Sequence, residues 1–103
     1  MENMTDVALE IVDNEFQRQF ETTIEDQTVK IEYAQQERKI FLTKLIMSDE
    51  LIEKGYAEDF IVAVFSIIED RNIRLVPTSP IIASFMRKNR RKYKDLLPVG
   101  INI

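Results

Sequence analysis

The sequence predicts an α/β fold of the α+β kind, with helices packed on a mixed, mostly antiparallel sheet. Three observations support this prediction. Segments that alternate apolar and polar residues occupy the first part of the chain, a long stripe of apolar residues at helical spacing follows, and a strand limited by a proline precedes a second helix. The predicted order of elements is therefore β-β-β-α-β-α.

Three strands are expected before the first helix. Residues 14–24 have one apolar face, because four side chains recur there at a spacing of two: Phe16, Phe20, Thr22 and Ile24. Residues 28–33 alternate in the same way, and residues 39–47 indicate a more buried strand. Polar turns at 25–27 and 35–38 are short enough to join the three strands into an antiparallel meander.

A helix is expected over residues 57–70, where the apolar spacing changes from two residues to three and four. The apolar residues then form one continuous stripe: Ala57, Phe60, Ile61, Val64, Phe65 and Ile68. Glu58 and Asp59 fall in the first turn, where negative charge interacts favourably with the helix dipole.

A short strand and a second helix complete the predicted fold. Residues 73–76 form a strand that ends at Pro77, which has no N–H group to donate to a neighbouring strand. Ser79 and Pro80 then suit the N-cap and the first position of a helix. The apolar side chains of this helix are Ile81, Ile82, Phe85 and Met86.

The composition excludes several kinds of site. The chain has no cysteine and no histidine, which excludes disulfides, thiolate zinc sites and cysteine nucleophiles and removes the commonest general base. No metal site is predicted. The longest nearly apolar run, residues 60–68, is far shorter than the roughly 18 residues that a membrane span needs. The first residues are acidic, unlike a secretory signal, so a cytoplasmic protein of one domain over residues 1–103 is expected.

Charge is distributed unevenly along the chain. Residues 1–70 carry a net charge of −11 and residues 71–103 a net charge of +7. Most of the positive excess lies in residues 87–94. Such a segment attracts the phosphates of a nucleotide cofactor or of a nucleic acid, although a solvated helix face is the favoured interpretation of a charged run this short.

Gly55 is one of only two glycines, and it lies between the third predicted strand and the long helix. A short strand-to-helix turn can leave several backbone N–H groups unpaired at the positive end of the helix dipole. These groups form a binding site for an anion, usually a phosphate. A single glycine at such a junction is more often only a turn, so this feature does not decide the function by itself.

Five short segments are informative when they are taken in order: residues 12–15, 47–51, 54–57, 73–80 and 93–97. Together they resemble the small, single-domain GNAT-type N-acetyltransferases of the YjdJ-type subgroup. The resemblance covers residues 10–97 and implies a GNAT-like acyl-CoA N-acyltransferase fold, in which acetyl-CoA lies between two splayed strands. It also implies direct attack of a primary amine on the thioester, without a covalent enzyme intermediate.

The same resemblance implies where the cofactor binds. The turn formed by residues 52–57 is expected to surround the pyrophosphate with its backbone N–H groups, and basic residues after Phe85 are expected near the adenosine phosphates. The cofactor-binding residues implied in this way are Met47, Glu53, Lys54, Gly55, Tyr56, Ala57, Arg87 and Lys88.

This sequence departs from the family pattern at positions that bear on function. Ile52 stands where the family usually has arginine or glutamine, and Glu53 places a carboxylate beside the expected polyanion, so the loop is degenerate. Ser79 stands where many members carry cysteine; it is a candidate catalytic hydroxyl, although its role as a helix cap is favoured. Tyr93 is a candidate acid for the leaving thiolate, although an anchoring aromatic is favoured.

Three hypotheses of function therefore remain open. The first is an N-acetyltransferase whose partners are acetyl-CoA and an unidentified amine. The second is a GNAT-fold binding or regulatory module without turnover. The third, less favoured, is a nucleic-acid or protein interaction module that uses residues 87–94. No membrane partner is expected, and a monomer or weak homodimer is compatible with each hypothesis.

Overall fold

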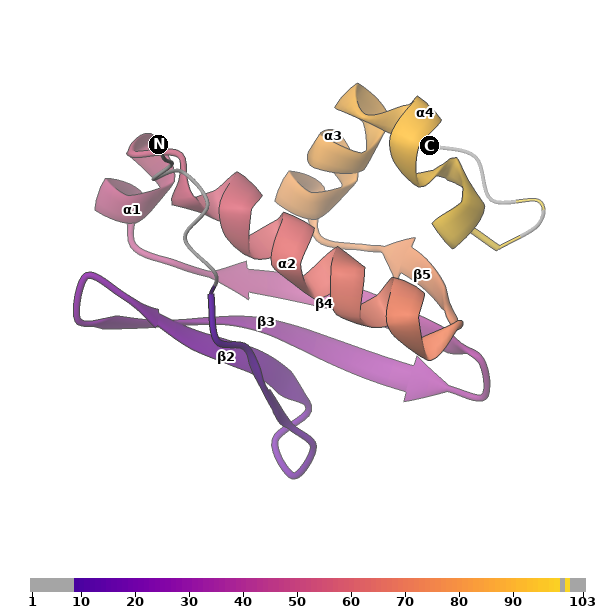
Figure 1. The fold of residues 1–103 in the computed structure, drawn as a ribbon, viewed down its shortest axis with the longest axis horizontal. Coiled ribbons are helices and arrows are strands. Elements are labelled where there is room, and N and C mark those ends of the chain that lie inside the picture. The colour runs from indigo at the N-terminus through magenta and orange to yellow at the C-terminus, as the bar shows by residue number, and fades with distance from the viewer. Residues whose placement is uncertain (1–8, 99, 101–103) are drawn as a thin grey trace.

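A computed structural model describes residues 9–98 and residue 100. One sheet contains the strands β1 (Val12–Asn14), β2 (Gln19–Ile24), β3 (Gln27–Gln36), β4 (Lys39–Ile46) and β5 (Arg74–Pro77). The helices are α1 (Asp49–Glu53), α2 (Tyr56–Arg71), α3 (Pro80–Lys88), α4 (Arg90–Tyr93) and a 3₁₀ turn, η1 (Lys94–Leu96). All of these helices lie on one face of the sheet (Figure 1). Strands β1 to β4 pair in antiparallel order and β5 is parallel to β4, which confirms the mixed, mostly antiparallel sheet.

The prediction of a single strand over residues 14–24 is wrong. Two strands, β1 and β2, occupy this segment and pair with each other, so Asn14 lies opposite Gln19. Phe16, expected on the apolar face, lies in the intervening turn and is 94% exposed. The turn is built by Asn14, whose side-chain oxygen accepts a hydrogen bond from the N–H of Gln17 at 3.1 Å, and by Arg18 at a φ of 57°.

A short helix that the sequence analysis did not predict lies between β4 and Gly55. The hydroxyl of Ser48 caps this helix, α1, by accepting a hydrogen bond from the N–H of Leu51 at 3.3 Å. The fully buried side chain of Leu51 anchors α1 to the core. Gly55 therefore lies at a corner between two helices rather than in a strand-to-helix turn. A further short helix, α4, and the turn η1 follow α3, where one helix had been expected.

The long helix is confirmed and supplies much of the core. Each of the six residues of its predicted apolar stripe is buried. They pack against buried side chains from the sheet, among them Phe20, Ile31 and Leu42. The predicted start of α3 is also confirmed, since the hydroxyl of Ser79 accepts a hydrogen bond from the N–H of Ile82 at 3.5 Å and Pro80 is the first helical residue.

The parallel pair β4–β5 is short, and its end defines the region where the site lies. Pairing stops at Leu42 and Pro77, and the N–H groups of Thr78 and Ser79 both donate to the carbonyl of Leu42, at 3.1 and 2.9 Å. The chain then turns into α3, while β4 continues to Ile46 beside β3 alone. The register between β3 and β4 shifts near Glu32, a bulge that bends the continuing strand. Beyond Leu42, β4 thus has an edge that β5 does not cover.

Candidate functional site

Among the residues that the structure describes, no side chain caps the first backbone donors of helix α2. Gly55 is its N-cap, at a φ of 90°, and makes no side-chain capping hydrogen bond. The first N–H groups of a helix have no acceptor within the helix. The amides of Tyr56, Ala57 and Glu58 are therefore left at the positive end of the α2 dipole, in the arrangement that binds anions.

The other two amides expected in this site already have acceptors. The N–H of Lys54 donates to the carbonyl of Glu50 at 3.2 Å, and the N–H of Gly55 donates to the carbonyl of Ile52 at 3.0 Å. Both bonds close the C-terminal end of α1, which the sequence analysis did not predict. The available donors therefore lie one or two residues further along the chain than residues 54–57.

A cavity of about 470 Å³ lies between the α1–α2 corner and α3. From the corner it is lined by Ile52, Gly55, Ala57 and Glu58, and from α3 by Ser84, Phe85 and Lys88, among others. Its volume lies within the range of about 300–1,000 Å³ that is usual for small-molecule sites. The structure thus brings the cofactor residues Gly55, Ala57 and Lys88, predicted from distant parts of the sequence, onto one cavity.

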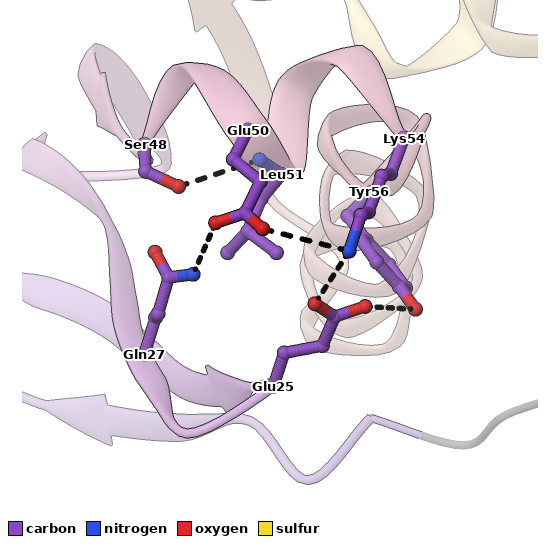
Figure 2. A network of polar contacts seen from close by, with 7 residues as sticks. All are labelled: Glu25, Gln27, Ser48, Glu50, Leu51, Lys54 and Tyr56. Atoms are coloured by element: carbon purple, nitrogen blue, oxygen red, sulfur yellow. Dashed lines mark hydrogen bonds and ion pairs between the residues drawn. The ribbon is translucent and has the colours of Figure 1, made fainter.

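The side chains of Lys54 and Tyr56 do not line this cavity but contact the turn between β2 and β3 (Figure 2). Lys54 Nζ donates to Glu25 Oε1 at 2.8 Å, and the Tyr56 hydroxyl donates to Glu25 Oε2 at 3.2 Å. Lys54 Nζ also lies 3.7 Å from Glu50 Oε2. The hydrogen bond from Lys54 is the main reason that the pKa of Glu25 is lowered, and the same contact raises the pKa of Lys54.

A comparison with protein families shows the family of this chain. The model of the family described as GCN5-related N-acetyl-transferase matches residues 19–96, which is most of the sequence. The chain belongs to this family. A search of curated proteins found no significant match. The family assignment associates the chain with acetyl transfer in general, and it covers β2 to η1, including the cavity and the α2 N-terminus.

Neither hydroxyl predicted as catalytic in this acetyltransferase-family chain lines the cavity. Ser79 is 3% exposed, and its hydroxyl caps α3. Tyr93 is 5% exposed, and its ring packs edge-on against Phe65 at a centroid distance of 5.0 Å and near Phe85 at 5.9 Å. The structure therefore favours the interpretations of Ser79 as a cap and of Tyr93 as an aromatic that anchors α4 to α2 and α3.

The remaining predicted cofactor residues lie apart from the cavity. Met47 is half-buried against the core, and Glu53 is exposed. Arg87 belongs to a second cavity of about 450 Å³ at the α3–α4 corner, which is lined by residues 87–92. Lys88 borders both cavities and so connects the basic segment to the α2 N-terminus.

The sequence analysis missed three residues at or near the cavity of this family member. Ser84 lies on it, one helical turn after Pro80 and one before Lys88, so the spacing of four residues could have indicated the face of α3. Glu58 places a carboxylate on the cavity, close to the free amides. Glu25 was not predicted because its partners, Lys54 and Tyr56, are 29 and 31 residues away in the sequence, and local patterns do not indicate such contacts.

The described part of the chain has neither a cluster of metal ligands nor a membrane-spanning helix. Residues 9–98 contain no group of three or more acidic side chains placed to hold a metal ion. No helix among them is long and apolar enough to cross a membrane.

Proposed function

We propose that the chain binds acetyl-CoA with its diphosphate at the N-terminus of α2 and transfers the acetyl group to a primary amine. The observation that carries the proposal is the set of uncapped amides of Tyr56, Ala57 and Glu58 beside a cavity that extends to α3. Membership of the GCN5-related family supports it. We also place the chain in the small YjdJ-type subgroup, on the segments that resemble that subgroup.

The donor set fits a diphosphate, because backbone N–H groups bind phosphate oxygens whatever side chains the loop carries. In this proposal Gly55 lets the ligand approach the backbone closely, and Lys88 supplies positive charge across the cavity. Apolar side chains such as Ile61 and Phe85 exclude water from the part of the cavity that lies between Gly55 and Lys88. When bound, acetyl-CoA supplies the acetyl group as a thioester that an amine can attack.

The uncovered edge of β4 is suited to orient the acyl group. Beyond Leu42 this edge carries backbone groups that β5 does not pair. A backbone N–H aimed at a carbonyl oxygen stabilises the negative charge that develops there during acyl transfer. Together with a fixed position for the amine, this is the main protein contribution that such a direct attack needs.

Two carboxylates weaken the expected affinity. Glu58 lies on the cavity, and Glu53 lies just before the corner. At about 6 Å from a phosphate charge and an effective dielectric of 20 to 80, each repulsion costs roughly 0.7 to 3 kcal/mol. Lys54 compensates little of this cost, because its ammonium is already paired with Glu25 and Glu50. We therefore expect weak binding.

A binding module without turnover is the second candidate. One observation favours it: both side chains predicted as catalytic, Ser79 and Tyr93, are buried in structural roles. An assay for acetyl transfer to a panel of amines separates the two candidates, since a module without turnover binds CoA but forms no acetylated product.

The substitution Gly55→Asp, with Gly55→Ala as its matched control, tests the diphosphate site. A methyl group at Gly55 would meet no atom within 4 Å, and both variants are strained at a φ of 90°. They differ in the carboxylate alone. Gly55→Asp should weaken CoA binding at least tenfold relative to Gly55→Ala, because the added charge opposes the diphosphate. Equal affinity of the two variants, measured by calorimetry, would show that the diphosphate binds elsewhere.

A further inference from the structure

The turn between β2 and β3 carries backbone strain at an acidic residue. Ile24 pairs with Gln27, so Glu25 and Asp26 are the two residues of the turn, and their φ values are 50° and 64°. The first position of this turn type normally takes asparagine, aspartate or glycine, and a left-handed backbone costs a residue such as glutamate roughly 1–2 kcal/mol. Strain of this kind persists only where the surrounding structure holds it, so the contacts of Glu25 are of interest.

Glu25 contacts both residues that flank Gly55 (Figure 2). One carboxylate oxygen accepts from Lys54 at 2.8 Å, and the other accepts from Tyr56 at 3.2 Å. Lys54 ends α1 and Tyr56 begins α2, so a single side chain connects both helices to the sheet. A parallel contact, from Gln27 Nε2 to Glu50 Oε1 at 3.2 Å, connects the same turn to α1.

Gly55 is the point of this corner where side chains restrict the backbone least. Gly55 has no side chain, and a methyl group there would touch nothing. Glycine is also the residue with the greatest backbone freedom. The direction of the first α2 amides depends on the backbone at Gly55 and Tyr56, so contacts on both sides of the glycine restrict that direction.

We propose that Glu25 is a positioning residue, which orients the uncapped amides of α2 for an anionic ligand by holding Lys54 and Tyr56. This inference rests on the proposed diphosphate site. It assigns Glu25 a role in affinity although its side chain does not line the cavity.

Simple electrostatics predicts the opposite sign. Removing a carboxylate near a polyanion should strengthen binding, and it also releases Lys54. The ion pair is well exposed, however, with side-chain exposures of 47% for Lys54 and 38% for Glu25, so solvent screens both charges. Lys54 also keeps Glu50 as a neighbour after Glu25 is removed. We therefore expect the loss of orientation to outweigh the gain in charge.

The test compares Glu25→Gln with Glu37→Gln. Glu37 lies in the turn at the other end of β3, at a φ of 54°, so both variants change one exposed acid at a left-handed turn position. Dissociation constants are measured by amide shifts for two probes: CoA, and pantetheine, which lacks the diphosphate. Glu25→Gln should weaken CoA about two- to fivefold and leave pantetheine unchanged, and Glu37→Gln should alter neither.

Tyr56→Phe is a second variant, which removes only one of the two contacts and should weaken CoA less than Glu25→Gln. Unchanged or tighter CoA binding by Glu25→Gln would overturn the positioning role, as would an equal loss for both probes. If the wild-type chain binds no CoA, the proposed function itself fails. If the wild-type chain binds CoA and the two variants Glu25→Gln and Glu37→Gln have equal affinities for it, only the inference about Glu25 fails.

Discussion

The two ends of α2 are held by the same chemistry in different surroundings. At each end a carboxylate accepts a hydrogen bond from a tyrosine hydroxyl and pairs with a cation. At the C-terminal end Asp13 accepts from Tyr33 at 2.6 Å and lies 2.8 Å from Arg71. At the N-terminal end Glu25 takes the corresponding position between Tyr56 and Lys54.

Burial distinguishes these two ends. The Asp13 side chain is only 13% exposed, and the guanidinium of Arg71 lies 5.7 Å from the centre of the fully buried Phe20 ring. The Glu25 side chain is 38% exposed and borders a corner with uncapped amides. Because a mostly buried carboxylate depends more strongly on its partners than an exposed one does, the C-terminal end should serve stability and the N-terminal end ligand binding.

Asp13→Ala should have the largest effect on stability. It removes the acceptor of the Tyr33 hydrogen bond and the anion of the ion pair with Arg71, and so leaves the buried Tyr33 hydroxyl and the Arg71 guanidinium without this partner. The expected loss in the free energy of unfolding is about 2–3 kcal/mol. Urea denaturation measures it, and CoA affinity should stay unchanged. A loss of CoA affinity without a loss of stability would reverse the assignment of the two ends.

Tyr33 should make the C-terminal end sensitive to alkali. Burial, followed by the contact with Asp13, raises the pKa of Tyr33 above the usual tyrosine range. A pKa that is raised on folding stabilises the protein below the unfolded-state value, about 10, and this contribution is lost as the pH rises further. Tyr33→Phe should cost about 1 kcal/mol at neutral pH and reduce the decline in stability above about pH 10. An unchanged alkaline profile in this variant would argue against the contact.

Glu25→Gln should change stability less than Asp13→Ala, and only where Glu25 is ionised. The pKa of Glu25 is lowered in the folded protein, mainly by the hydrogen bond from Lys54. Its contribution is therefore present above the unfolded-state value of about 4.3 and lost as the pH falls through the lower folded-state pKa. The difference in stability between the wild type and this variant should disappear in acid. A difference that persists at the lowest pH would have another cause.

The fold was predictable where local signals agree with packing. The apolar stripe of α2 and the Ser79–Pro80 helix start are confirmed because both depend on spacing or capping within a few residues. The break between β1 and β2 was missed because an asparagine side chain and a left-handed arginine make the turn without glycine or proline. The helix α1 was missed because only five residues form it and one buried side chain, Leu51, anchors it.

The site was predictable only in part, for a related reason. Gly55 and Lys88 were indicated by residue type, and they do line one cavity. Which amides remain free depends on the hydrogen bonds of α1, which sequence patterns did not show. The contacts of Glu25 join residues far apart in the chain, and they become visible only once the sheet brings the β2–β3 turn beside the α1–α2 corner.

A titration of the wild-type chain with CoA, followed by its amide resonances, shows whether the diphosphate lies at the N-terminus of α2. We expect the largest shifts at Tyr56, Ala57 and Glu58, with smaller shifts at Ser84 and Lys88 across the cavity and none at the Asp13 end of α2. Shifts confined to residues 87–92, at the basic α3–α4 corner, or the absence of any shift, would contradict it.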